Sequence, residues 1–331
     1  MSDPLRALLA TRPVLIADGA MGTSLFVQGL ETGGSPEFWN LERPERVRAV
    51  HRSFVDAGAD LILTNSFGGN RYRLMLHGAE GRVAELNRAA AGLAREVADA
   101  AGRPALVAGS IGPTGEIFAP IGALEHDAGA AAFAEQAAAL AEGGCDLLWI
   151  ETISGAEELA AAVAGAARTG LPIVATMTFD THGRTMMGVT PGAAMGLRAA
   201  LPARPVAFGA NCGIGPAQLI ESVLGLMRAA APGDLIVAKG NCGVPHYHEG
   251  RIHYDGTPEV MAAYACMARD AGARVIGGCC GTTAAHVRAM AEALAACPPG
   301  PAPERAAIEA ALGPLPAPPG AAPARPRRRR T

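Results

Sequence analysis

The sequence predicts a single α/β domain folded as a (β/α)8 (TIM) barrel, and three observations support this prediction. Short apolar runs rich in Val, Ile and Leu recur along the chain, and each is followed by glycine or polar residues and then by a segment with helical spacing. The runs are continuously apolar, which is typical of parallel strands covered by helices on both faces. Eight such units in about 290 residues match the size of a (β/α)8 barrel. An open, doubly wound sheet is the alternative architecture.

The eight predicted strands are separated by segments that read as helices. In the segment 44–59, Val47, Val50, Phe54 and Val55 recur on one helical face. The predicted strands lie at residues 14–19, 61–66, 105–112, 147–152, 173–179, 206–212, 235–241 and 274–280.

The composition changes after Cys297. Residues 298–331 are rich in proline and close with four consecutive arginines before the final threonine. Such a segment buries too little apolar area to offset the entropy of ordering it. We therefore expect a barrel at residues 1–297 and a flexible or loosely docked tail at 298–331, with a short helix at 303–312.

Composition also limits the function. The chain has 331 residues, 50% of them hydrophobic, and a formal net charge of −3, so it carries no overall basic field for nucleic acid. No apolar run reaches the roughly 18 residues that span a bilayer. The seven cysteines are odd in number and mostly embedded in apolar runs, unlike a secreted disulfide framework. We expect a soluble, cytoplasmic protein with reduced thiols and with neither a nucleic-acid nor a membrane partner.

Three thiols are expected at one side of the barrel mouth, because βα loops converge at the carboxyl ends of the strands. Cys212 ends the sixth predicted strand, and the adjacent Cys279 and Cys280 end the eighth among glycines that permit a sharp turn. Three thiolates with an open fourth position are typical of a catalytic zinc site. A vicinal disulfide or two ordinary buried cysteines are the alternatives for the adjacent pair.

A metal held by three thiolates binds an incoming thiol and keeps it deprotonated, which favours thiol alkylation over hydrolysis. Asp18 and Glu151, at the first and fourth strand ends, could hold an ammonium group of that thiol substrate, or they could serve as cap or rim hydrogen-bonding groups. Lys239, the single lysine of the chain, ends the seventh strand. It either tunes the site electrostatically or lies at the rim with its head in water.

Six motifs lie at the strand ends, in order along the chain: "DGAMGT" (18–23), "LTNSFGGNRYRL" (63–74), "GSIGPTGE" (109–116), "ET" (151–152), "GANCGIGP" (209–216) and "GGCCGTT" (277–283). From about residue 10 to residue 297, they resemble the zinc-dependent homocysteine S-methyltransferase family. The resemblance implies a (β/α)8 barrel, zinc held by Cys212, Cys279 and Cys280, and homocysteine bound to the metal through its sulfur.

The resemblance also implies an amino-acid pocket, whose matching residues are Asp18, Gly19, Ser110 and Glu151. We therefore expect the three cysteines and Glu151 to be the catalytic residues of an enzyme that methylates homocysteine to methionine.

Members of this family differ in their methyl donor. The stretches "SPEFWNLERPERV" (35–47), "RTMMGVT" (184–190) and "IHYDGTPEVMAAYA" (252–265) look most like bacterial betaine-homocysteine methyltransferases. Betaine carries a permanent cation that an aromatic face can hold. We expect Trp39 to supply that face, with Asn65 and Phe67 nearby. The alternatives are S-methylmethionine as donor, or a homocysteine-activating subunit of a split cobalamin-dependent methionine synthase that receives the methyl group from a corrinoid protein in trans.

Overall fold

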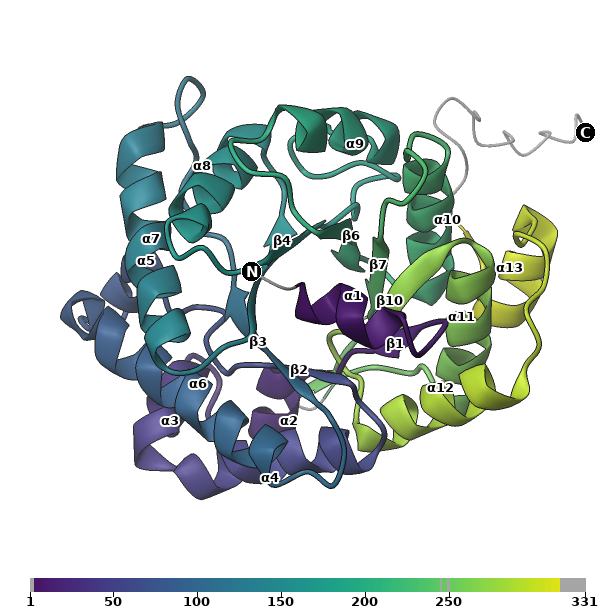
Figure 1. Ribbon diagram of the computed structural model, residues 1–331, viewed down its shortest axis with the longest axis horizontal. Helices are drawn as coiled ribbons and strands as arrows, with labels where there is room; N and C mark the ends of the chain where they lie inside the picture. Colours follow the sequence, from purple (N-terminus) through teal and green to yellow (C-terminus); the bar gives the residue numbers. More distant parts are fainter. Residues whose placement is uncertain (1–2, 245, 249–250, 316–331) are drawn as a thin grey trace, which may run out of the picture.

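Eight parallel strands form a nearly closed barrel inside a ring of helices in the computed structural model, which describes residues 3–244, 246–248 and 251–315 (Figure 1). Each strand falls within one of the eight runs predicted from the sequence, except that β4 ends one residue later and the last strand begins one residue earlier than predicted. The (β/α)8 prediction is therefore confirmed, and the doubly wound alternative is wrong. The strands are β1 (Leu15–Ile16), β2 (Leu61–Leu63), β3 (Leu106–Ile111), β4 (Leu147–Ile153), β5 (Ile173–Met177), β6 (Ala207–Cys212), β7 (Ile236–Gly240) and β10 (Ala273–Gly278).

The barrel closes between its first two strands. The ladder runs in the order β1-β10-β7-β6-β5-β4-β3-β2, and every neighbouring pair is parallel. A parallel bridge between Ala17 and Leu61 joins the two ends of this order. The Asp18 amide extends the junction by donating to the Leu61 carbonyl oxygen at 3.0 Å. All eight carboxyl ends consequently point to one mouth.

Helices follow the strands and cover the outside of the barrel (Figure 1). The face predicted for residues 44–59 is confirmed, because Val47, Val50, Phe54 and Val55 are buried in α4. The helices are α1 (Pro4–Leu9), α2 (Met21–Val27), α3 (Trp39–Glu42), α4 (Pro44–Asp56), α5 (Arg71–Met75), α6 (Val83–Asp99), α7 (His126–Glu142), α8 (Ala156–Ala167), α9 (Pro191–Ala200), α10 (Pro216–Met227), α11 (Pro258–Asp270), α12 (Ala284–Ala296) and α13 (Arg305–Leu312), with short 3-10 turns at Pro36–Phe38 and Glu80–Arg82.

Two of the three apolar clusters among the described residues hold the barrel itself. The larger one lies between the strands and the outer helices. The smaller one fills the barrel interior, where Trp149 of β4 is fully buried. Leu5 of α1 is also fully buried in this inner core, so α1 closes the barrel end opposite the mouth (Figure 1). The mouth is therefore the end at which a ligand can enter.

A strand pair and a C-terminal helix are additions to the eight βα units. Strands β8 (His246–His248) and β9 (Arg251–His253) form an antiparallel pair between β7 and α11. The short helix expected at 303–312 occurs as α13, and Ile308 on it is fully buried against the outer helices. The arginine run of the tail lies outside the described residues. Within the part of the chain that is described, no helix is both long and apolar enough to cross a membrane.

Candidate active site

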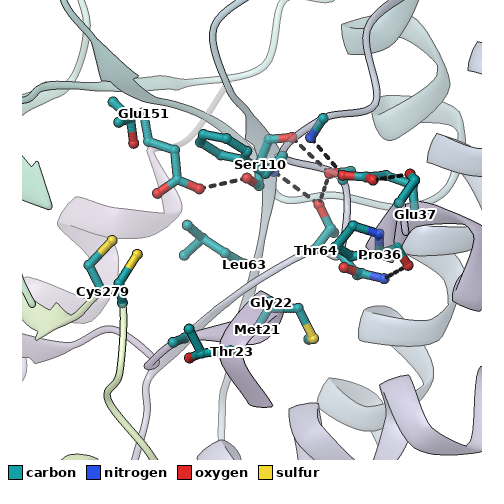
Figure 2. Close-up of a pocket in the computed structure, with 18 of the residues that line it drawn as sticks. Met21, Gly22, Thr23, Pro36, Glu37, Leu63, Thr64, Ser110, Glu151 and Cys279 are labelled. Atoms are coloured by element: carbon teal, nitrogen blue, oxygen red, sulfur yellow. Dashed lines mark hydrogen bonds between the residues drawn. The ribbon is translucent and has the colours of Figure 1, made fainter. Parts of the chain in front are cut away.

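A cavity of about 480 Å³ opens at the mouth, and its wall is built from the loops that follow the strands. All but one of the site residues expected from the sequence line it. The Glu151 carboxylate and the Cys279 thiol face the same space (Figure 2). The expected residues that line this cavity are Asp18, Gly19, Asn65, Phe67, Ser110, Glu151, Cys212, Cys279 and Cys280.

The three predicted thiols form one cluster. The Sγ atoms of Cys212, Cys279 and Cys280 all lie within 4.8 Å of one another. The turn after β10 that brings the adjacent cysteines together depends on Gly281, which has a φ of 78° in the left-handed region. On Gly277, an added Cβ would lie 2.8 Å from the Ala17 Cβ, so only glycine lets β10 approach β1 this closely.

Two asparagine amides support this cluster. Asn241 Nδ2 lies 3.5 Å from Cys212 Sγ, and Asn211 Nδ2 lies 3.8 Å from Cys279 Sγ. Amide donors beside sulfur stabilise the thiolate form, which is the form that ligates a metal. A donor set of three sulfurs at the edge of an open cavity fits a zinc ion with an exchangeable fourth position. Cys212, Cys279 and Cys280 are therefore the residues that could hold a metal.

The carboxylates Asp18 and Glu151 lie at neighbouring points of the cavity floor. Glu151 Oε1 accepts a hydrogen bond from Ser110 Oγ at 2.6 Å (Figure 2). Asp18 Oδ2 accepts from the Leu63 amide at 2.7 Å, and Asp18 Oδ1 lies 3.1 Å from the Lys239 ammonium. Within the described residues the second oxygen of Glu151 makes no hydrogen bond. That oxygen is the free acceptor of the floor.

Lys239 is a buried cation, with only 3% of its surface exposed. The interpretation of this lysine as a rim residue with its head in water is therefore wrong. Burial by itself lowers the pKa of Lys239, but the negative charges of Asp18, Glu151 and Cys279 raise it by more than burial lowers it. The net pKa lies above the usual value, so the ammonium stays protonated. Burial in turn raises the pKa of Glu151, and the nearby Lys239 charge opposes that rise. The cation thus helps to keep two carboxyl groups ionised in a site that also holds three thiols.

Three further predicted residues shape the cavity wall. An added Cβ on Gly19 would lie 2.6 Å from the Thr282 carbonyl oxygen, so this glycine allows the first and last loops to touch. Asn65 directs its Nδ2 away to the Pro36 carbonyl oxygen at 2.7 Å and thereby fixes the loop. The Phe67 side chain is 39% exposed and packs over Gly112. Phe67 therefore presents an aromatic surface to the cavity.

Trp39 is the predicted site residue that the structure does not bring to the cavity. It begins α3, is 9% exposed and packs in the outer core. The Arg46 guanidinium carbon lies 5.1 Å from the centre of its ring. The indole face expected to hold the donor cation thus already faces an arginine of α4. The chain folds back between β1 and α4, and this turn carries Trp39 to the outside of the mouth.

Sequence reasoning did not assign roles to several residues of this site. Arg73 and His77 line the cavity on the side of the second loop. Asn211 and Thr152 exchange hydrogen bonds beneath it. Lys239, in contrast, stands out in the sequence, because it is the single lysine of a chain otherwise rich in arginine. Arg73 lies in the motif at 63–74, but that motif also contains Arg71, and the sequence does not show which of the two arginines faces the cavity.

The chain is similar to two mycobacterial methionine synthases. Methionine synthase of Mycobacterium tuberculosis is 35% identical over 301 residues, which cover 85% of this chain and 25% of the relative. Methionine synthase of Mycobacterium leprae is 33% identical over 309 residues, with 88% and 25% covered. The chain therefore spans about a quarter of the length of these relatives.

The chain is also similar to solved structures of a homocysteine methyltransferase. The homocysteine methyltransferase MmuM of Escherichia coli in a metallated form is 27% identical, with a TM-score of 0.73 over 88% of this chain and 99% of that chain. Its oxidised form is 28% identical, with a TM-score of 0.74, 87% of this chain and 99% of that chain being covered. Residues 15–294, which include every residue of the thiol cluster and the carboxylate floor, match the homocysteine S-methyltransferase family. The chain belongs to the homocysteine S-methyltransferase family.

Proposed function

We propose that this protein transfers a methyl group to the sulfur of homocysteine, with Zn²⁺ held by Cys212, Cys279 and Cys280, and so forms methionine. The observation that carries the proposal is the position of the thiol cluster, whose sulfur atoms lie within 4.8 Å of one another and line the same cavity as Glu151. A bound zinc ion would supply an exchangeable position at which the homocysteine thiol is held as a thiolate near neutral pH.

The floor of the cavity supports an amino-acid substrate. The free Glu151 oxygen would accept a hydrogen bond from the homocysteine ammonium, while Ser110 holds the other oxygen. Asp18 already uses both oxygens, one for Lys239 and one for the Leu63 amide, so its role would be electrostatic. Counting formal charges, Asp18, Glu151 and Lys239 sum to −1, which one substrate ammonium would neutralise.

We propose betaine as the donor. The homocysteine sulfur would attack a methyl carbon of the quaternary ammonium group, so that an S–C bond forms while the C–N bond breaks; the C–N electron pair would stay on nitrogen, and dimethylglycine would leave. Support comes from two residues of the cavity wall. Phe67 presents an aromatic surface that attracts a quaternary ammonium group. The Arg73 guanidinium has no hydrogen bond or ion pair within the described residues and could donate hydrogen bonds to the betaine carboxylate.

A second candidate is a homocysteine-activating subunit that receives the methyl group from a separate corrinoid protein. The observation that favours it is the identity of 33–35% to two methionine synthases of which this chain spans only a quarter. In that case the cavity would receive the methyl carrier of a partner rather than a small cation.

The test is methionine formation by the purified, zinc-loaded protein with homocysteine and one donor at a time: betaine, S-methylmethionine, or a methylcobalamin-loaded corrinoid protein. We expect turnover of homocysteine when betaine is the donor and not with either of the other two donors. Turnover only with the corrinoid protein would establish the second candidate, and turnover only with S-methylmethionine would replace betaine as donor. No methionine with any of the three would refute the proposed methyl transfer.

A further inference from the structure

Asn211 connects the two halves of the candidate site. It is fully buried in β6, and its side chain reaches past β5 to the end of β4. The Thr152 amide donates to Asn211 Oδ1 at 2.8 Å, and Asn211 Nδ2 donates back to Thr152 Oγ1 at 2.8 Å. Thr176 of the intervening β5 donates its hydroxyl to the same Oδ1 at 2.7 Å. One amide therefore ties three strand ends together.

The backbone at both ends of this connection is strained. Thr152 has a φ of 64° and Cys212 a φ of 62°, both in the left-handed region that non-glycine residues rarely adopt. For a β-branched residue such as Thr152 this conformation is unfavourable, so it persists only where surrounding contacts enforce it. The third such residue in the described chain, His182, lies in an exposed turn. The two strained residues at the mouth, in contrast, belong to the site or adjoin it: Cys212 is one of the clustered thiols, and Thr152 follows Glu151.

The left-handed conformations of Thr152 and Cys212 determine the orientation of functional side chains. Thr152 directly follows Glu151, which carries the free carboxylate oxygen, and Cys212 is itself one of the clustered thiols. The same Asn211 Nδ2 also lies 3.8 Å from the sulfur of Cys279, which comes from the other end of the chain. Asn211 thus contacts the backbone that orients the carboxylate, precedes one thiol and borders a second.

We propose that Asn211 is a positioning residue that sets the distance between the ammonium-binding carboxylate and the thiol cluster. An amide is required, because Oδ1 must accept from Thr152 and Thr176 while Nδ2 donates to Thr152 Oγ1 and toward Cys279. An aspartate of the same shape keeps the acceptor but replaces the donor with a negatively charged oxygen beside a thiolate. The inference rests on the proposed function in one respect, namely that the Glu151 carboxylate binds the homocysteine ammonium. The part that concerns metal binding by the thiol cluster does not depend on any substrate.

The experiment compares four purified proteins: wild type, Asn211→Asp, Asn211→Ala, and Asn211→Ala combined with Thr152→Gly. Zinc retention is measured by competition with a chromophoric chelator, and homocysteine binding is measured by calorimetry without any donor. We expect Asn211→Asp to weaken zinc retention by tenfold or more, the scale for losing a partner of a metal ligand. We expect Asn211→Ala to weaken homocysteine binding by a similar factor.

The glycine variant separates positioning from general destabilisation. Glycine adopts a φ near 64° without a Cβ penalty. If Asn211 acts by holding Thr152 in this conformation, Thr152→Gly restores at least part of the homocysteine affinity lost in Asn211→Ala. A fold effect alone would not be reversed by removing a side chain. As a matched control, Asn87→Ala removes another fully buried amide, one outside the site, and should leave zinc retention of the folded protein unchanged.

Two results would overturn the proposal: wild-type zinc retention in Asn211→Asp, or no recovery of homocysteine binding in the double variant. If the wild-type protein retains zinc but does not bind homocysteine, the proposed function fails instead. In that case the zinc-retention comparison still decides whether Asn211 positions the thiol cluster.

Discussion

The Lys239 ammonium lies 3.1 Å from Asp18 Oδ1, and both side chains are almost completely buried, at 4% and 1% exposure. The pair joins β7 to the loop after β1, on opposite sides of β10 in the barrel. A buried ion pair stabilises a fold little when it is compared with apolar packing, but removal of one partner leaves an uncompensated charge. This relationship makes the single lysine of the chain sensitive to substitution.

We expect Lys239→Met to lower the free energy of unfolding by about 3–5 kcal/mol, the range for breaking a buried pair from one side. Urea denaturation followed by circular dichroism measures this change. Addition of Asp18→Asn should recover part of the loss, because the second substitution removes the orphaned charge. If Lys239→Met unfolds at the wild-type urea concentration, the pair does not stabilise the barrel.

The thiol cluster predicts which cysteines hold metal. Cys280→Ala should lose zinc and methyl transfer together, because two thiolates do not complete the site. X-ray absorption of the wild-type protein should show Zn–S distances of about 2.3 Å. Cys266→Ala is the matched control, since Cys266 lies outside the cluster and should leave zinc content unchanged. Stoichiometric zinc in Cys280→Ala would contradict the assignment.

Glu151→Gln tests the ammonium site. The substitution keeps the shape but removes the charge, so homocysteine binding should weaken by about 2 kcal/mol, while zinc content stays the same. Calorimetric titration with homocysteine measures the effect. Glu158→Gln changes another buried carboxylate, which accepts hydrogen bonds from Thr114 outside the cavity, and should bind homocysteine normally. Equal affinities in the two variants would give Glu151 a structural role.

The donor prediction centres on Phe67. Its ring should attract the betaine cation by about 1–2 kcal/mol once the site is closed to water. Phe67→Ala should therefore raise the KM for betaine by about tenfold and leave homocysteine affinity unchanged. Trp39→Ala serves as the comparison, because its indole packs in the core beneath Arg46 and should affect stability rather than the betaine KM. A raised KM for betaine in Trp39→Ala together with an unchanged KM in Phe67→Ala would instead make Trp39 the residue that contacts the donor.

His51 predicts a pH dependence of stability. It is fully buried in α4, and within the described chain neither ring nitrogen has a hydrogen-bond partner. Burial lowers its pKa from 6.5 to about 3. Between these values the unfolded chain binds a proton that the folded protein does not, so stability falls as the pH decreases through this window. The loss should reach about 2 kcal/mol at pH 5 relative to neutral pH.

Comparison of urea unfolding at pH 7 and pH 5 measures this loss. His51→Leu should remove that part of the pH dependence, whereas His77→Leu, at an exposed position, should keep it. An unchanged difference between the two pH values in His51→Leu would show that another group causes the acid sensitivity.

The sequence by itself determined the barrel and the thiol cluster. Apolar runs of strand length alternating with helical segments leave few ways to bury both faces of a sheet, and closure brings every carboxyl end to one mouth. Cys212 and Cys280 could therefore be placed together although they are far apart in the chain. The same rule brought Asp18 and Glu151 to the cavity floor, because each ends a strand.

Only the tertiary structure decided where the side chains between and beneath these ends point. Trp39 follows the first strand, but packing against α4 turns it into the outer core. Lys239 could have extended to water, and a carboxylate on another loop draws it inward. Asn211 and Thr152 are 59 positions apart, and neither carries a signal for the other. Side-chain direction depends on long-range neighbours, whereas strand positions depend on local periodicity, and that physical difference separates what could be predicted from what could not.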